Sequence, residues 1–204
     1  MGALVFNGWA ASPRAWELCR FRRDRIVSYL DEEPKSALPG TIVVGWSLGG
    51  NRAIRFAAAH PGEVKALLLV SPVVRMMKDR EWPGMGERRL AALLGAFEMF
   101  GGQGFGGVDY PVNPYQIDSH DDLKKGIDYL HDSDVRDEVH KLPETMPITV
   151  FHAEKDIVAN VRNSTFIGEV CPWANVEIVA GGEHALPVAM PEKIDAAIDF
   201  LAAI

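Results

Sequence analysis

The chain has 204 residues, of which 48% are apolar and 24% charged, as is typical of one soluble globular domain with a sizeable core. Its formal net charge of −7 disfavours nucleic acid or an anionic membrane as a general partner, so we expect neither. Two cysteines, Cys19 and Cys171, give no disulfide framework and no metal-ligand spacing, so we expect reduced core residues in a cytoplasmic protein.

The N-terminus enters an apolar segment within three residues, without the basic region or long apolar run of a signal peptide or membrane span. We therefore interpret the chain as mature from residue 1 and expect a monomer. Short apolar runs then alternate with helix-like segments, which predicts parallel strands joined by crossover helices. Several runs are apolar throughout, as burial on both faces requires. The expected strands are residues 3–6, 25–29, 41–44, 66–70, 148–151 and 176–179.

Helices are expected after Ser12-Pro13, after Leu48, near residues 158–170 and from Pro191 to the C-terminus. The order of elements predicts an α/β protein with a mostly parallel sheet of about six strands and flanking helices. Residues 73–146 break the alternation because they contain no convincing strand, so we interpret them as a helical lid insertion within a single domain, 1–204. The glycine-rich residues 101–107 do not follow a strand, and we interpret them as a flexible joint.

The pentapeptide Gly45-Trp46-Ser47-Leu48-Gly49 follows one expected strand and precedes an expected helix. This context is typical of a nucleophile elbow, in which a tight strand-to-helix turn projects a serine hydroxyl away from the backbone. Glycine is needed at both ends because a side chain there would crowd the turn. We therefore predict that Ser47 is a nucleophile.

A serine hydroxyl is a poor nucleophile at neutral pH unless a histidine accepts its proton and an acid holds that histidine. Asp156 and His184 each follow an expected strand, at the edge where open α/β sheets place their sites. We predict that Ser47, Asp156 and His184 form a catalytic triad. Asp31 and Glu154 are the alternative acids, and the other five histidines are interpreted as structural.

Acyl transfer also needs N–H donors for the oxyanion that develops on the attacked carbonyl. One expected donor is the backbone N–H of Leu48, directly after the nucleophile. The second is the N–H of Trp9, after Gly8 in the loop that follows the first strand. No metal or other cofactor is expected, because the sequence contains no cluster of metal-ligand spacing.

These motifs as a set resemble the α/β-hydrolase superfamily over nearly the whole chain: Phe6-Asn7-Gly8-Trp9, Gly45 to Gly50, His60-Pro61-Gly62-Glu63-Val64, Asp156 and Gly182-Glu183-His184. Trp46 and the stretch Glu81 to Met85 are similar to the pimeloyl-ACP methyl ester carboxylesterase family, which has a tryptophan in its elbow and Trp-Pro-Gly early in its lid. The segment from Gly126 to Arg136 is similar to the end of that lid. The resemblance implies an esterase that demethylates a pimeloyl chain tethered to acyl carrier protein.

The chain departs from the pattern of that superfamily in three places. Asn7 stands where a histidine is usual, the antiparallel strands that normally precede the first motif are absent, and residues 31–40 are too short for the usual loop and helix. The missing pieces lie at the edge of the sheet and not at the elbow. They therefore weaken inferences about substrate more than inferences about the triad.

Substrate selection is expected to rest on the insertion. Trp46, Met76, Met77 and Phe97 are the candidate substrate-binding residues, since methionine and aromatic side chains adapt to an acyl chain, although they are equally typical of core packing. Basic residues exceed acidic ones between Arg75 and Arg89. An acidic carrier protein is the expected partner of Arg75, Arg88 and Arg89, and a solvated helix face is the alternative.

The sequence thus predicts a serine carboxylesterase that acts on a small acyl ester through an acyl-enzyme. A thioesterase or a general short-acyl esterase is the alternative that would use the same residues. A ligand receptor that kept the fold without turnover is the alternative of another class. A dehalogenase or epoxide hydrolase is disfavoured, because an aspartate nucleophile would stand at position 47.

Overall fold

The computed structural model describes residues 2–100 and 110–204, and the order of their elements confirms the predicted α/β class. Six strands, all parallel to their neighbours, form one sheet in the order β2-β1-β3-β4-β5-β6. Every predicted strand overlaps an observed one. The strands are β1 (Ala3–Phe6), β2 (Arg23–Val27), β3 (Thr41–Trp46), β4 (Val64–Val70), β5 (Ile148–Ala153) and β6 (Asn175–Val179).

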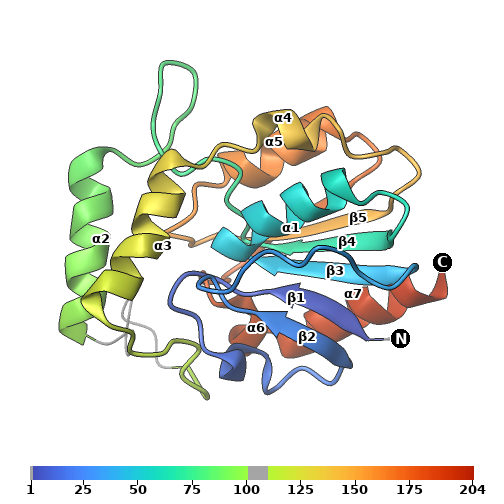
Figure 1. The fold of residues 1–204 in the computed structure, drawn as a ribbon, viewed down its shortest axis with the longest axis horizontal. Helices are drawn as coiled ribbons and strands as arrows, with labels where there is room; N and C mark the ends of the chain where they lie inside the picture. The colour runs from blue at the N-terminus through green and yellow to red at the C-terminus, as the bar shows by residue number, and fades with distance from the viewer. Residues whose placement is uncertain (1, 101–109) are drawn as a thin grey trace.

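Helices cover both faces of this sheet (Figure 1). The side chains of successive strand residues pack on alternate faces. Leu4 and Phe6 pack on the face of α1 (Leu48–Ala59) and α5 (Arg162–Val170). Val5 packs on the opposite face, with the 3₁₀ turn η1 (Pro13–Trp16), α6 (Leu186–Ala189) and α7 (Pro191–Ala203). The interior strands are mostly apolar, since both of their faces are buried, and their polar residues are Thr41, Lys65, Thr149 and His152.

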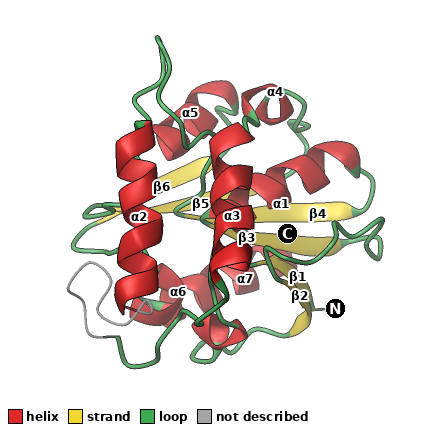
Figure 2. Cartoon of the chain, turned by 60° about the vertical axis from the view of Figure 1, so that its left-hand side comes forward, coloured by secondary structure: helices red, strands yellow, loops and turns green. Residues whose placement is uncertain are grey.

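The connection between β4 and β5 contains α2 (Glu87–Phe100), α3 (His120–Asp132) and α4 (Arg136–Val139). Helices α2 and α3 contact each other and lie side by side across the end of the sheet at which the strands terminate (Figures 1 and 2). That residues 73–146 work as a lid within a single domain stays a prediction. The interpretation of residues 101–107 as a joint concerns residues outside the described part.

Two predicted helices differ from the observed ones for local reasons. The helix expected near residue 158 begins at Arg162, because the Asp156 carboxylate accepts the N–H groups of Val158 and Ala159 and holds a turn there. The segment after Ser12 is a four-residue 3₁₀ turn, whose first free N–H is capped by the Ser12 hydroxyl.

The two cysteines are buried and free, as expected. No helix among the described residues combines the length and the hydropathy that crossing a membrane demands.

The elbow depends on a close approach between α1 and strands β1 and β3. A side-chain carbon at Gly49 would overlap the carbonyl of Phe6, and one at Gly45 would lie 2.6 Å from the Ala53 methyl group. This confirms the steric argument for both glycines. Ser47, between them, has φ of 57° and ψ of −120°, a conformation that a non-glycine residue keeps only where its surroundings enforce it.

This packing predicts opposite effects for alanine at two helical glycines. Gly49→Ala should lower the free energy of unfolding by about 2 kcal/mol or more, because backbone atoms of β1 would have to move. Gly95→Ala in α2 is the matched control, since nothing lies within 4 Å of the added methyl group. It should stabilise the protein by about 0.5–1 kcal/mol. Urea unfolding followed by circular dichroism checks both, and equal effects would contradict the packing argument.

Candidate active site

Ser47 lies in the sharp turn between β3 and α1, with only 5% of its surface exposed. Its backbone N–H donates to the carbonyl of Val70, the last residue of the neighbouring strand β4, at 3.0 Å. Its own carbonyl accepts the N–H groups of Gly50 and Val73. These bonds hold the turn against the end of β4 and fix the direction of the hydroxyl.

His184 connects Ser47 with Asp156. Its Nε2 atom lies 3.0 Å from the Ser47 Oγ atom, and its Nδ1 atom lies 2.7 Å from Asp156 Oδ2. Because a carboxylate only accepts hydrogen bonds, we assign the imidazole proton to Nδ1. The lone pair of Nε2 is then available to accept the serine proton. The structure therefore brings together the three residues predicted as a triad, each from the loop after a different parallel strand. That they carry catalysis is a proposal, argued below.

The Asp156 carboxylate is fully engaged. Besides His184, it accepts the N–H groups of Val158 and Ala159 at 2.8 Å each. Burial alone would raise its pKa, but the charge of His184 and these hydrogen bonds outweigh burial and lower it below the ordinary value. Asp156 is thus ionised wherever His184 is free to act as a base.

The loops that carry Asp156 and His184 are tied to each other. The Lys155 N–H donates to the Gly182 carbonyl at 2.9 Å, and the Gly181 N–H donates to the Glu154 carboxylate at 2.8 Å. The alternative acid Glu154 is therefore bonded to the backbone and not to His184. Asp31, the other alternative, accepts the Ser28 N–H in an exposed turn.

Trp46 lies beside the histidine and holds its loop. Its indole N–H donates to the His184 carbonyl at 3.0 Å, and the two ring centroids are 5.8 Å apart. Trp46 does not line the cavity next to Ser47. The contacts favour a supporting role over the predicted substrate contact.

The loop after β1 carries the predicted oxyanion donors. In the described part of the chain, the backbone N–H groups of Trp9 and Leu48 have no hydrogen-bond partner. The Trp9 indole N–H is used elsewhere, since it donates to the Leu123 carbonyl of α3. Only the backbone N–H of Trp9 is therefore available for an oxyanion.

Asn7, which replaces the usual histidine, holds this loop in place. Its amide donates to the Ala11 carbonyl at 2.9 Å and accepts the Trp16 indole N–H at 3.1 Å. Both partners are buried, as is Asn7 itself. Between them Ala10 has φ of 50°, so the loop is a strained turn fixed by two buried bonds. The departure from the family pattern is thus compensated within the loop.

A small cavity of about 20 Å³ adjoins Ser47, enough for about one water molecule. The predicted substrate residues Met76 and Phe97 line it, whereas Met77 packs in the core beside Met85. Sequence reasoning gave no role to three further lining residues. These are Tyr115, Leu130 and Val158.

The three cations predicted to bind a partner differ in their surroundings. Arg75 is half-buried and lies within 3.1 Å of the carboxylates of Asp79 and Asp134, so its charge is neutralised within the chain. Arg88 and Arg89 are exposed on α2. Of the three predicted cations, Arg88 and Arg89 therefore present their charge to solvent.

His152 is a buried histidine whose Nε2 atom lies 3.9 Å from Asp156 Oδ2. Its ring nitrogens lie 2.8 Å from the Ser164 Oγ atom and 3.1 Å from the Ala159 carbonyl oxygen. Burial lowers its pKa despite the nearby Asp156 charge, so the ring is neutral. Among the described residues no group of three or more His, Cys, Asp or Glu side chains is arranged to hold a metal ion.

Comparison with known proteins places the chain in an esterase family. Residues 8–150 match the model of an esterase family described as "Putative esterase". A pimeloyl-[acyl-carrier protein] methyl ester esterase of Nitrosomonas europaea is 23% identical over 97% of this chain and 94% of that protein. The enzyme of the same description from Chromobacterium violaceum is 41% identical, over 45% of this chain and 35% of that protein.

Solved structures share the fold. The esterase EaEST from Exiguobacterium antarcticum superposes with a TM-score of 0.76 at 17% identity, covering 100% of this chain and 92% of that one. A bromoperoxidase from Bacillus anthracis gives a TM-score of 0.72 at 16% identity, over 100% and 93% of the two chains. At such identities the likeness concerns the fold alone, and it agrees with the predicted α/β-hydrolase fold.

The neutral state of His152 predicts a pH dependence of stability. Burial lowers the pKa of His152 in the folded chain. Below about pH 6.5 this imidazole is therefore protonated in the unfolded chain before it is protonated in the folded chain. The free energy of unfolding should therefore fall with decreasing pH there, by at most about 1.4 kcal/mol per pH unit from this group. His152→Gln should flatten that slope in urea titrations between pH 7 and 5. The exposed His140→Gln is the control, and an equally flattened slope there would contradict the assignment.

Proposed function

Because the chain belongs to this esterase family, we propose that it is a serine carboxylesterase that hydrolyses acyl esters through a covalent acyl-enzyme. The observation that carries the proposal is the continuous hydrogen-bonded path from Ser47 through His184 to Asp156. This chemistry requires an ionised carboxylate beside Nδ1 and a free lone pair on Nε2. The lowered pKa of Asp156 supports the first requirement.

In the first half-reaction the Ser47 oxygen attacks the ester carbonyl while His184 Nε2 takes the hydroxyl proton. The negative charge that develops on the carbonyl oxygen would be received by the backbone N–H groups of Trp9 and Leu48. The imidazolium then gives its proton to the departing alkoxide. The products of this step are an alcohol and an acyl group bonded to Ser47.

In the second half-reaction a water molecule takes the place of the alcohol. His184 accepts a proton from the water as it attacks the acyl-enzyme, and then returns that proton to the Ser47 oxygen. Asp156 stays ionised throughout and stabilises the imidazolium in both halves. The buried bonds of Asn7 keep the oxyanion loop ready without rearrangement during the reaction.

The favoured physiological substrate is the methyl ester of a pimeloyl chain on acyl carrier protein. Two features support it: the curated relatives bear that description, and the exposed cations Arg88 and Arg89 lie on α2 at the active-site end of the sheet. An acidic carrier would be attracted to such cations. Arg75 would contribute less, because Asp79 and Asp134 already neutralise it. A cytosolic monomer remains part of the proposal, and free cysteines are compatible with a reducing compartment.

The proposal predicts that three single variants each lose ester hydrolysis. Ser47→Ala, His184→Ala and Asp156→Asn should each lower kcat for a small activated ester by about 10⁴-fold or more, because the three act as a unit. Ser47→Ala should also abolish labelling by a fluorophosphonate. Ser71→Ala, one strand away, should keep both properties. Normal turnover by any of the three folded variants would exclude this mechanism.

The carrier proposal predicts a salt-sensitive reaction. Hydrolysis of methyl pimeloyl-ACP should slow between 50 and 500 mM salt, since exposed charges are screened over about 8 Å at physiological ionic strength. A free methyl ester should show little change. Arg88→Glu combined with Arg89→Glu should lower kcat/KM for the carrier-bound ester and not for an uncharged free methyl ester, whereas Arg14→Glu, outside this patch, should lower neither. Active protein that leaves methyl pimeloyl-ACP intact would favour the general esterase or thioesterase.

A further inference from the structure

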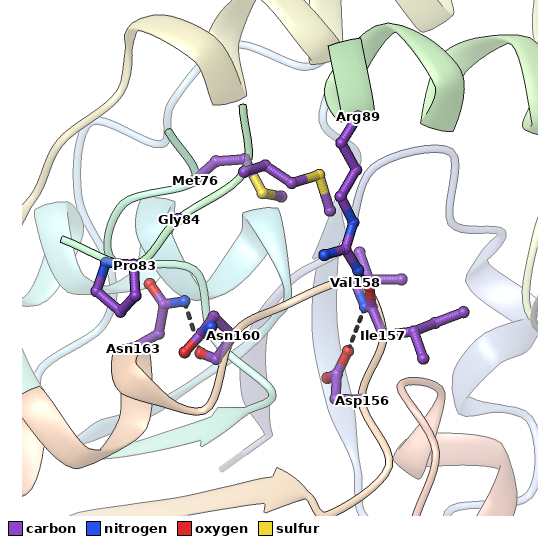
Figure 3. A pocket seen from close by; sticks show the side chains of 10 residues that line it. Met76, Pro83, Gly84, Arg89, Asp156, Ile157, Val158, Asn160 and Asn163 are labelled. Atoms are coloured by element: carbon purple, nitrogen blue, oxygen red, sulfur yellow. Dashed lines mark hydrogen bonds between the residues drawn. The ribbon is translucent and has the colours of Figure 1, made fainter. Parts of the chain in front are cut away.

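A second and larger cavity lies next to the one at Ser47. Its volume is about 140 Å³, against about 20 Å³ beside the serine. Met76 and Val158 line both cavities, so these two side chains form the partition between them. In Figure 3 the larger cavity lies between the segment that carries Met76, Pro83 and Gly84 and the loop after β5.

Most polar groups around the larger cavity are already used. Both Asp156 oxygens accept hydrogen bonds, as described above. The Asn163 carbonyl oxygen accepts the N–H groups of Val74 and Arg75, and its amide nitrogen donates to the Asn160 carbonyl. These groups shape the cavity but have little capacity left to select a ligand.

Arg89 is different. Its side chain reaches from α2 down to the cavity, and one guanidinium nitrogen donates to the Ile157 carbonyl at 2.8 Å (Figure 3). This bond fixes the guanidinium at the rim. Its remaining N–H groups have no partner in the described part of the chain. A positioned guanidinium with spare donors is suited to a carboxylate or phosphate, which it binds through two parallel hydrogen bonds.

The larger cavity has a polar side, which includes the Asp156 carboxylate, and an apolar side. Met76, Met85 and Val158 lie along the apolar side, and methionine side chains change shape at low cost. Arg89, Leu93 and Phe97 follow one another at intervals of four residues, so they share one face of α2. Leu93 and Phe97 line the cavity at Ser47, and Arg89 lines the larger one. One helix face thus connects the two cavities, and the rise along α2 from Arg89 to Phe97 is about 12 Å.

We propose that the larger cavity is a subsite for an anionic group, a carboxylate or a phosphate, on the same substrate whose ester carbonyl lies at Ser47. Arg89 holds the anion. Met76 changes its side-chain conformation so that the two cavities join when an acyl chain passes between them. This proposal rests on the proposed esterase function and adds the substrate class, an ester with a negative charge several bonds from the scissile group. The role of Arg89 is binding, so its loss acts on KM.

Two matched substrate pairs test the proposal and separate the two sources of the anion. Monomethyl pimelate carries a free carboxylate, and dimethyl pimelate lacks it. The methyl pimeloyl thioester of phosphopantetheine carries a phosphate, and that of pantetheine lacks it. Arg89→Ala should raise KM about tenfold for the charged member of at least one pair, leave its uncharged counterpart within about twofold, and leave kcat unchanged. The pair that responds identifies the anion.

Two variants control for charge in general. Arg88→Ala removes the same charge one residue away on α2, so a long-range field would change KM equally in both alanine variants. We expect Arg89→Ala to raise KM at least five times as much as Arg88→Ala does, since Arg89 lines the cavity and Arg88 does not. Arg89→Lys should recover part of the binding, because it keeps the charge but not the paired donors.

Binding can also be measured without turnover. Pimelate dianion, titrated into Ser47→Ala and followed by NMR, should shift the signals of Ile157 and Val158, and Arg89→Ala in the same background should weaken that binding. Equal effects of Arg88→Ala and Arg89→Ala, or an equal effect on charged and uncharged esters, would overturn the subsite. An absence of all ester hydrolysis would instead overturn the proposed function, whatever pimelate does.

Discussion

The close contact between the first turn of α1 and the ends of β1 and β3 is the constraint on which the site depends. Because Gly45 and Gly49 have no side chains, the helix approaches the strands closely enough to force Ser47 into its strained turn. The hydroxyl then projects beyond the sheet. The parallel order of the strands brings the loops of Asp156 and His184 to the same edge, where hydrogen bonds tie those loops together.

Residues whose position follows from local chain geometry could be predicted from the sequence. The elbow has a strand, two glycines and a helix around Ser47, and the loops of Asp156 and His184 each follow an apolar strand. Tyr115 and Val158 had no such signal. They reach the cavity from irregular segments, and only tertiary packing shows that Tyr115 contacts the Phe97 and Trp46 rings. The start of α5 was missed for a similar reason, because the bonds of Asp156 to its own loop compete with helix formation.

The same difference explains the candidates whose contacts differ from those predicted. Composition marked Trp46, Met77 and Arg75 as available for a ligand, but it could not show that their polar or apolar surfaces were already used. Trp46 holds the His184 loop, Met77 packs in the core, and Arg75 is neutralised by two carboxylates. Asn7 shows the opposite. It departs from the superfamily pattern, yet its side-chain amide both donates and accepts a hydrogen bond within its own loop.

Helix α2 connects recognition with chemistry in the proposed mechanism. Phe97 packs on Trp9 at 4.9 Å and on Tyr115 at 5.4 Å, so it contacts the loop that supplies a proposed oxyanion donor. Arg89, two turns earlier on the same face, lies at the rim of the larger cavity. In the proposal, Arg89 holds the anion while Leu93 and Phe97 contact the acyl part of the same substrate. One face of α2 would therefore carry both interactions.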